Sequence, residues 1–204
     1  MIEIMKIMAF YPQKISEVIY MLTQKRENPM AVRSKNALSG ALLKLMMTKS
    51  LSDISISDIT ERAGLSRQTF YTNFQRKEDI IVYLLHGLFG RYHDRLVKSK
   101  PVPENLIIDY FIFWGDSRDF LTLLFKQNLG YLFQDCNRSF FIEDTDCLND
   151  IFTAEDWQLP YIKASLAGIT YELLLIWVTK DQGLSVTVLN SLTSNLLGGK
   201  LFAE

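Results

Sequence analysis

Residues 55–77 constrain the fold of this chain most, because they read as a helix, a tight turn and a second short helix. Apolar residues at i, i+3 and i+7, the spacing of one helix face, are Ile56, Ile59 and Ala63. Ser55 stands at the expected N-cap, and Asp58 occupies the acidic position of a capping box. Gly64 follows the last apolar position, where a left-handed residue commonly ends a helix. The pattern predicts a short capped helix that stops at Gly64.

The second helix is predicted over residues 67–74, with Ser66 as its cap. Phe70 and Phe74 are four residues apart, so both rings can dock on the first helix. The open face then carries Arg67, Gln68, Thr69 and Thr72, with Tyr71, Asn73 and Lys77 at its rim. An apolar back and a slim polar front are what a helix–turn–helix needs to enter the major groove of DNA.

The run A-G-L-S-R-Q-T-F-Y-T-N-F-Q-R-K-E-D-I-I, residues 63–81, resembles the DNA-binding domain of the TetR family of bacterial transcriptional regulators. The matching positions are Ala63, Gly64, Ser66, Phe70, Tyr71, Phe74, Lys77, Glu78 and Asp79. Asn73 departs from the family pattern, in which many members carry His at that place. The rest of the chain resembles the family only in length and helical character.

This resemblance implies an all-α protein, with an N-terminal three-helix helix–turn–helix domain and a larger helical domain for ligand binding and dimerisation. We place the DNA-binding domain at residues 29–77 and the larger domain at 78–204. Residues 1–28 are an N-terminal extension, read either as an extra helix or as the product of an upstream start codon. Tyr71 and Lys77 resemble backbone-contacting residues of the family. The candidate DNA-binding residues are Ser55, Ser57, Ser66, Arg67, Gln68, Thr69, Tyr71, Thr72, Asn73 and Lys77.

Charge is distributed unevenly along the chain. The formal net charge is −1, yet residues 29–77 hold eight basic and three acidic side chains, whereas residues 78–204 hold ten and seventeen. A basic segment ahead of an acidic remainder suits a phosphate-facing module on a body that does not bind DNA. With 48% apolar residues and only five prolines, the chain should be globular and almost entirely helical.

The remaining helices are predicted from apolar spacing and breaks. One runs over residues 31–48, and a long one over 78–97 links the two domains until Pro101 and Pro103 end it. The body is rich in aromatic residues. A ligand pocket among them would be lined by Phe111, Trp114, Phe125, Phe133 and Tyr171. The alternative is a packed helical core.

The last two helices, predicted over residues 160–180 and 185–197, resemble the pair through which the family dimerises as a four-helix bundle. Small residues in the first of them allow close helix approach. The candidate dimer residues are Ala164, Ala167, Gly168, Tyr171, Leu189, Leu192 and Leu196. The alternative is that both helices belong to the core of a monomer.

Catalytic and metal-binding signals are weak. His86 and His93 are seven residues apart without a third ligand, and no Gly-rich phosphate loop or nucleophile motif occurs. Cys136 and Cys147 form neither a metal-ligand spacing nor a disulfide framework, which fits a cytoplasmic chain. The apolar stretch at 166–178 is too short to span a membrane. We expect no enzyme activity, cofactor, metal ion or membrane partner.

The function predicted from the sequence is a sequence-specific DNA-binding transcriptional regulator. It would be a ligand-responsive repressor that binds a palindromic operator as a homodimer and responds to an unidentified small-molecule effector. The alternative is a protein of the same fold that organises the nucleoid or controls division. A helical small-molecule-binding protein or an enzyme without DNA function is disfavoured by the motif at residues 66–77.

Overall fold

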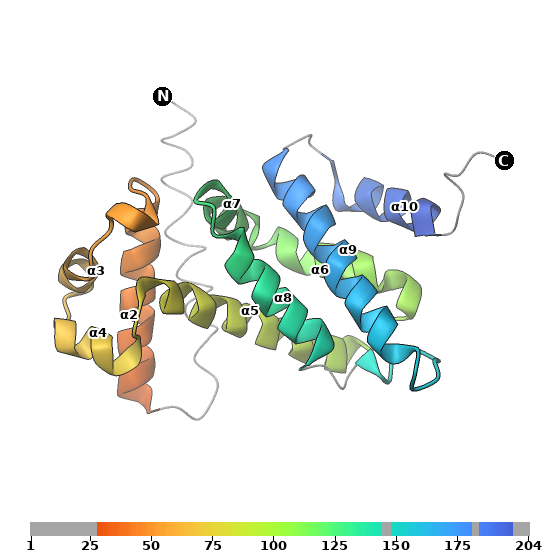
Figure 1. The fold of residues 1–204 in the computed structure, drawn as a ribbon, viewed down its shortest axis with the longest axis horizontal. Helices are drawn as coiled ribbons and strands as arrows, with labels where there is room; N and C mark the ends of the chain where they lie inside the picture. The colour runs from red at the N-terminus through yellow and green to blue at the C-terminus, as the bar shows by residue number, and fades with distance from the viewer. Residues whose placement is uncertain (1–27, 144–147, 181–183, 198–204) are drawn as a thin grey trace. The chain divides into compact units, whose positions relative to one another are not determined.

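The computed structural model describes residues 28–143, 148–180 and 184–197. Figure 1 draws them as a ribbon coloured by residue number. Every regular element in these ranges is a helix, which confirms the all-α prediction. The chain divides into two compact units, residues 1–88 and 89–204. This division falls inside a long helix, later than the expected boundary after Lys77. The predicted N-terminal extension lies outside the described residues except for Asn28.

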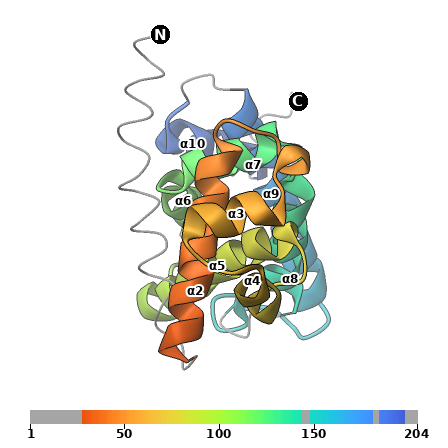
Figure 2. The same ribbon diagram turned by 90° about the vertical axis from the view of Figure 1, so that its left-hand side faces the viewer.

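The first unit holds the predicted helix–turn–helix. Its elements are α2 (Pro29–Met46), η1 (Leu51–Asp53), α3 (Ile56–Ala63), α4 (Arg67–Asn73) and the first part of α5 (Lys77–Ser99). α2 begins at Pro29 because the Asn28 side chain accepts a hydrogen bond of 3.0 Å from the Met30 N–H, and proline suits the first helical position. Figure 2 shows α3 crossing α2 with α4 beside them.

A small apolar core fixes α4 to the rest of this unit. Phe70 is fully buried and Phe74 is 6% exposed, and their ring centroids lie 6.1 Å apart. Phe74 also contacts the ring of Tyr83 on α5 at 5.8 Å. From α2 and α3 the core receives mainly aliphatic side chains, namely Leu38, Leu42, Met46 and Ile59. Both phenylalanines are thus buried on the inner side of α4, as their spacing indicated.

The second unit contains the remaining helices. After the end of α5 they are η2 (Pro103–Asn105), α6 (Leu106–Gly115), α7 (Arg118–Lys126), α8 (Gly130–Ile142), α9 (Leu159–Thr179) and α10 (Val186–Leu197). α9 packs on α7 and α8, whereas α10 packs on α6. α5 ends at Ser99, two residues beyond the predicted end, and is followed by a left-handed Lys100 with a φ of 42°. Arg95 on α5 makes a bidentate ion pair with Asp109 on α6, and this hydrogen bonding raises the pKa of Arg95.

A buried hydrogen-bond network ties three helices of this unit together. The Tyr110 hydroxyl donates to Asn137 Oδ1 at 2.8 Å. The Asn137 amide donates to the Ala167 carbonyl at 2.9 Å and to Thr170 Oγ1 at 3.2 Å. Burial raises the pKa of Tyr110 well above its ordinary value, so the phenol stays protonated. Every polar group of Asn137 in this core has a partner, which is what a buried amide requires.

α9 is long and apolar enough to cross a membrane. Within the described ranges it is the one helix with this length and composition. Its most apolar stretch has a mean hydropathy of 1.4, and 33% of that stretch is buried in the protein. The core helix of a soluble protein can have the same length and composition. α9 packs on α7 and α8 and contributes Thr170 to the network above, as a core helix does.

Candidate nucleic-acid interface

The first helix of the motif, α3, starts at a complete capping box. Ser55 Oγ accepts from the Asp58 N–H at 3.0 Å, and the Asp58 carboxylate accepts from the Ser55 N–H at 2.8 Å. Both bonds involving Ser55 lower the pKa of Asp58. α3 ends at Gly64, whose φ of 66° lies in the left-handed region. The predicted cap and stop are both confirmed.

The second helix, α4, is held at its start and anchored at its back. Ser66 Oγ accepts from the Thr69 N–H at 3.0 Å, and Phe70 is buried as described above. Arg67, Gln68, Tyr71 and Thr72 are exposed, whereas Thr69 and Asn73 are half-buried. The structure therefore places six of the candidate DNA-binding residues on one short helix with an apolar anchor.

Several polar side chains of α4 are already bonded to the helix itself. Thr72 Oγ1 donates to the Gln68 carbonyl at 2.9 Å, and Asn73 Nδ2 donates to the Thr69 carbonyl at 2.7 Å. Thr69 Oγ1 lies 2.9 Å from Ser66 Oγ. Exposed Arg67 and Gln68 thus carry most of the donor and acceptor capacity that α4 offers to a base edge.

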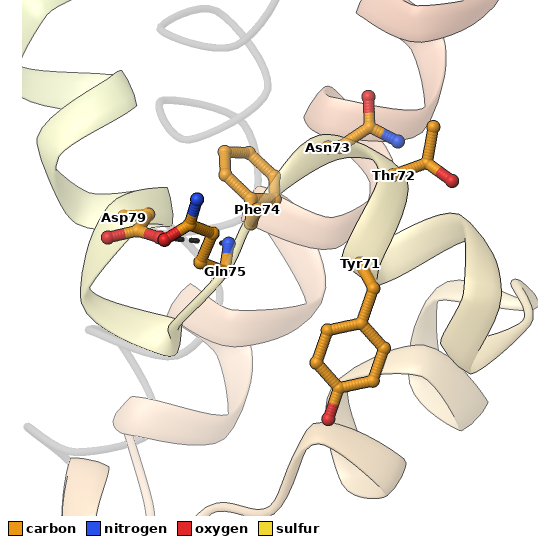
Figure 3. Close-up of a pocket in the computed structure, with 6 residues that line it drawn as sticks. All are labelled: Tyr71, Thr72, Asn73, Phe74, Gln75 and Asp79. Carbon is orange, nitrogen blue, oxygen red and sulfur yellow. Dashed lines mark hydrogen bonds between the residues drawn. The ribbon is translucent and has the colours of Figure 1, made fainter.

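The end of α4 borders a shallow hollow of about 350 Å³, shown in Figure 3. Its lining comprises Tyr71, Thr72, Asn73, Phe74, Gln75 and Asp79. Tyr71 lies on a different side of the α4 end from Thr72 and Asn73 (Figure 3). The Asp79 carboxylate accepts from the backbone N–H groups of Gln75 and Arg76 at 2.9 and 2.8 Å. The turn between α4 and α5 is therefore fixed by a side chain from the first turn of α5.

Two candidate DNA-binding residues have side chains that are hydrogen-bonded within the domain. The Lys77 ammonium is turned into the domain, where it donates to the carbonyls of Leu51 and Ile54 at 2.6 Å each. The Ser55 hydroxyl is used in the capping box, where it also donates to the Asp58 carboxylate at 2.8 Å. Ser57 is exposed on α3. The sequence pattern did not indicate these contacts of Lys77, because the two acceptor residues lie 26 and 23 residues earlier.

The candidate ligand-pocket residues gather in the aromatic core of the second unit. Trp114 lies 4.8 Å from Phe133 between ring centroids, and Phe133 stacks on Tyr171 at 6.3 Å. Phe125 contacts both Phe133 and Tyr171. Phe111 packs against Trp177 and Tyr110 instead, and Tyr110 in turn contacts Trp114. Four of the five residues thus form one connected cluster, in which the rings contact one another.

The candidate dimer residues divide into an exposed and a buried group. Ala164 and Gly168 on α9 and Leu192 on α10 are exposed. Ala167 and Leu189 are only 8% and 4% exposed, so the assignment of these two side chains to a dimer surface is corrected. They pack inside their own protomer, and little of their surface remains for a partner. The side chain of Leu196 lies outside the described residues.

Tyr171, which was predicted for both the ligand pocket and the dimer surface, is half-buried. It lies within the aromatic cluster of the second unit. Burial, followed by the nearby Glu172 carboxylate, raises its pKa. Its position favours the pocket assignment over the dimer assignment.

Possible metal ligands are scattered. Within the described ranges no three His, Cys, Asp or Glu side chains lie close enough together to hold a metal ion. Burial raises the pKa of Cys136 to about 11, which keeps its thiol protonated and unreactive at neutral pH. Cys147 and most of the acidic loop before Asp150 lie outside the described residues.

A capped α3, a turn at Gly64 and an anchored, polar-faced α4 define a helix–turn–helix DNA-binding domain. Residues 39–84 match the family model of the bacterial regulatory proteins of the tetR family. This part of the chain is therefore similar to the DNA-binding domain of that family.

Two proteins that are similar to parts of this chain are named as transcriptional regulators. The HTH-type transcriptional regulator EthR of Mycolicibacterium smegmatis is 35% identical over 75 residues, which are 35% of this chain and 35% of EthR. The match therefore spans about a third of the length of that relative. The crystal structure of Thermus thermophilus FadR, a TetR family transcriptional repressor in complex with lauroyl-CoA, matches with a TM-score of 0.48 and 19% identity. That alignment covers 83% of this chain and 96% of the other.

Proposed function

We propose that this protein is a ligand-responsive transcriptional repressor that binds a palindromic operator as a homodimer. The observation that carries the proposal is the exposed face of α4, where Arg67, Gln68 and Thr72 stand on a helix fixed by buried Phe70. Arg suits the acceptor pair of guanine and Gln suits the edge of adenine. Within this proposal the protein acts in the cytoplasm and is a regulator rather than an enzyme.

Backbone contacts would come from the rest of the motif. Tyr71 is 53% exposed beside the hollow at the end of α4 and carries a hydroxyl donor. Ser57 and Ser66 stand near the starts of α3 and α4, where helix N-termini favour phosphate. Contacts of this kind fix the position of the protein on the duplex and carry no base information themselves.

Dimerisation would use the exposed face of α9. Gly168 is exposed, and a Cβ added there would meet no atom within 4 Å. Ala164 lies one turn earlier on the same face, and the large side chains Tyr161 and Ile176 are 71% and 48% exposed along the helix. Small residues flanked by exposed apolar ones allow a second helix to approach closely.

The effector would be an apolar molecule with a hydrogen-bond acceptor. Trp114 is fully buried, and its Nε1–H has no acceptor among the described residues. An unpaired buried donor is costly, and a ligand oxygen would satisfy it. Trp114 contacts Phe133, which in turn contacts Phe125 and Tyr171. These rings would provide the apolar wall around such a ligand.

The proposal is tested by measuring binding to the DNA upstream of the protein's own gene at several salt concentrations. We expect tight binding whose logarithm falls linearly with the logarithm of salt concentration, and higher transcription when the gene is deleted. No preference for this DNA or for any other sequence would contradict the proposal. Binding at many dispersed genomic sites without an effect on transcription would instead support a nucleoid or division role.

A further inference from the structure

Lys77 is the first residue of α5, and its side chain reaches the connection between α2 and α3. Its ammonium donates at 2.6 Å to the carbonyl of Leu51 in η1 and at 2.6 Å to the carbonyl of Ile54 just after it. The side chains of both acceptor residues are buried, at 6% and 1% exposed, so the backbone that carries these carbonyls is anchored in the core. Two of the three ammonium donors are thus used within the domain.

A second residue in the first turn of α5, Asp79, is also hydrogen-bonded to a neighbouring segment. The Asp79 carboxylate binds the N–H groups of Gln75 and Arg76, in the turn that follows α4. Asp79 therefore joins the start of α5 to the turn that follows α4, and Lys77 joins it to the segment that leads into α3. Charge-assisted hydrogen bonds thus attach the first turn of α5 to the segment before α3 and to the turn after α4.

We infer that Lys77 is a positioning residue that fixes the helix–turn–helix to the start of α5, and that this role, rather than a phosphate contact, is its main contribution to operator binding. The inference rests on the proposed function. α5 leaves the first unit after Leu88, so its first turn is where any movement of this helix reaches the motif. A displaced α5 would have to break both Lys77 bonds or carry η1 and the start of α3 with it.

This role predicts a different pattern from that of a phosphate contact. A residue that positions the motif improves the fit to the operator, so its loss weakens specific binding more than non-specific binding. A residue that binds phosphate acts on all sequences alike, and its loss lowers the salt slope by about 1. The two roles therefore separate when operator and random DNA are compared across salt concentrations.

The test compares the wild-type protein with Lys77→Met, Lys77→Arg and the control Lys44→Met, which removes one charge from an exposed site on α2. We expect Lys77→Met to lose about tenfold in operator affinity, a difference of about 1.4 kcal/mol. Its salt slope and its affinity for random DNA should equal those of Lys44→Met. Lys77→Arg keeps the charge, but its planar fork does not concentrate the donors at one point between the two carbonyls. It should therefore also lose operator affinity.

Hydrogen exchange supplies a readout that is independent of DNA. The Ile54 N–H donates to the Leu51 carbonyl and the Asp53 N–H donates to the Ser50 carbonyl. Both amides should exchange faster in Lys77→Met, with no change in the control. The inference would be overturned if exchange were unchanged while Lys77→Met lost affinity equally for operator and random DNA and its salt slope fell by about 1. Full operator binding by Lys77→Met would overturn it as well. If the wild-type protein recognised no operator, the proposed function would fail while hydrogen exchange still tested the Lys77 contacts.

If Lys77→Met does not fold, Lys77→Arg decides alone. Wild-type operator affinity in Lys77→Arg would overturn the inference, because that variant retains everything a phosphate contact needs. Reduced operator affinity with unchanged random-DNA affinity would support it.

Discussion

The hydroxyl of Thr72 donates to the backbone carbonyl of Gln68 one turn earlier on α4, at 2.9 Å. This bond uses the only hydrogen of the hydroxyl, while the residue itself remains exposed. The side chain therefore offers DNA a methyl group and a hydroxyl oxygen whose proton is turned back to the helix. A methyl group in this place is suited to the C5-methyl group of thymine.

Replacement of Thr72 tests this assignment. Thr72→Val keeps the methyl group and should retain the operator preference, whereas Thr72→Ser should lose about 0.8 kcal/mol at one thymine, or about fourfold in affinity. The measurement is competition binding with operators in which each thymine is replaced by uracil, which lacks the methyl group. A loss of affinity in Thr72→Val with none in Thr72→Ser would show that the hydroxyl, not the methyl group, carries the contact.

Gln68 should contribute to base reading directly. It is exposed on α4, and a bidentate contact to adenine is worth about 1–3 kcal/mol of discrimination. Gln68→Ala should therefore relax the preference at one or two operator positions, with nearly unchanged affinity for random DNA. An unchanged preference, measured by binding-site selection with the purified variant, would remove Gln68 from the base-reading residues.

The face of α9 around Gly168 should form the dimer. Gly168→Leu adds a side chain into open space within the protomer and replaces a poor helix former, so the fold of the protomer should be preserved. We expect the variant to sediment as a monomer and to lose operator binding. Gly90→Leu is the matched control, because Gly90 is also helical, exposed and open around its Cα. A dimeric Gly168→Leu protein with normal operator binding would place the dimer surface elsewhere.

The capping box predicts an acid dependence of the first unit. The bonds from Ser55 lower the folded-state pKa of Asp58 below its ordinary value of 3.8. A lowered carboxyl pKa stabilises the fold above the unfolded value, and that stabilisation is lost as the pH falls through the folded value.

Asp58→Asn should therefore be less stable than wild type at neutral pH, and the difference should shrink below pH 3.8. Urea unfolding followed by circular dichroism, at a series of pH values, measures both. A stability difference that stayed constant from neutral pH to strong acid would show that ionised Asp58 contributes nothing to the cap.

Local signals in the sequence predicted the DNA-binding domain well. The cap at Ser55, the stop at Gly64 and the inward pair Phe70 and Phe74 all depend on neighbours within four residues. Hydrogen bonding and apolar spacing at that range follow from helix geometry alone. The bounds of α4 were predicted to within one residue for the same reason.

Contacts between distant segments were not predictable in this way. Lys77 looked like an available surface cation, because nothing in its local pattern indicates carbonyls more than twenty residues away. The local sequence around Asn137 likewise does not indicate that this residue is 1% exposed and connects α6, α8 and α9. Apolar spacing indicated that Ala167 and Leu189 pack against a neighbouring element. It did not show whether that neighbour is the protomer's own core or a second copy, and the structure places both in the core.

Selection of binding sites from a random duplex library by the purified wild-type protein tests the central claim most directly. A homodimer with one α4 per protomer should enrich a palindrome, with half-sites about 10–10.5 base pairs apart between centres, or a multiple of this spacing. Arg67, Gln68 and Thr72 should favour guanine, adenine and thymine contacts within each half-site. Enrichment of no sequence, at a salt concentration where the protein still binds DNA, would contradict the assignment of α4 as a base-reading helix.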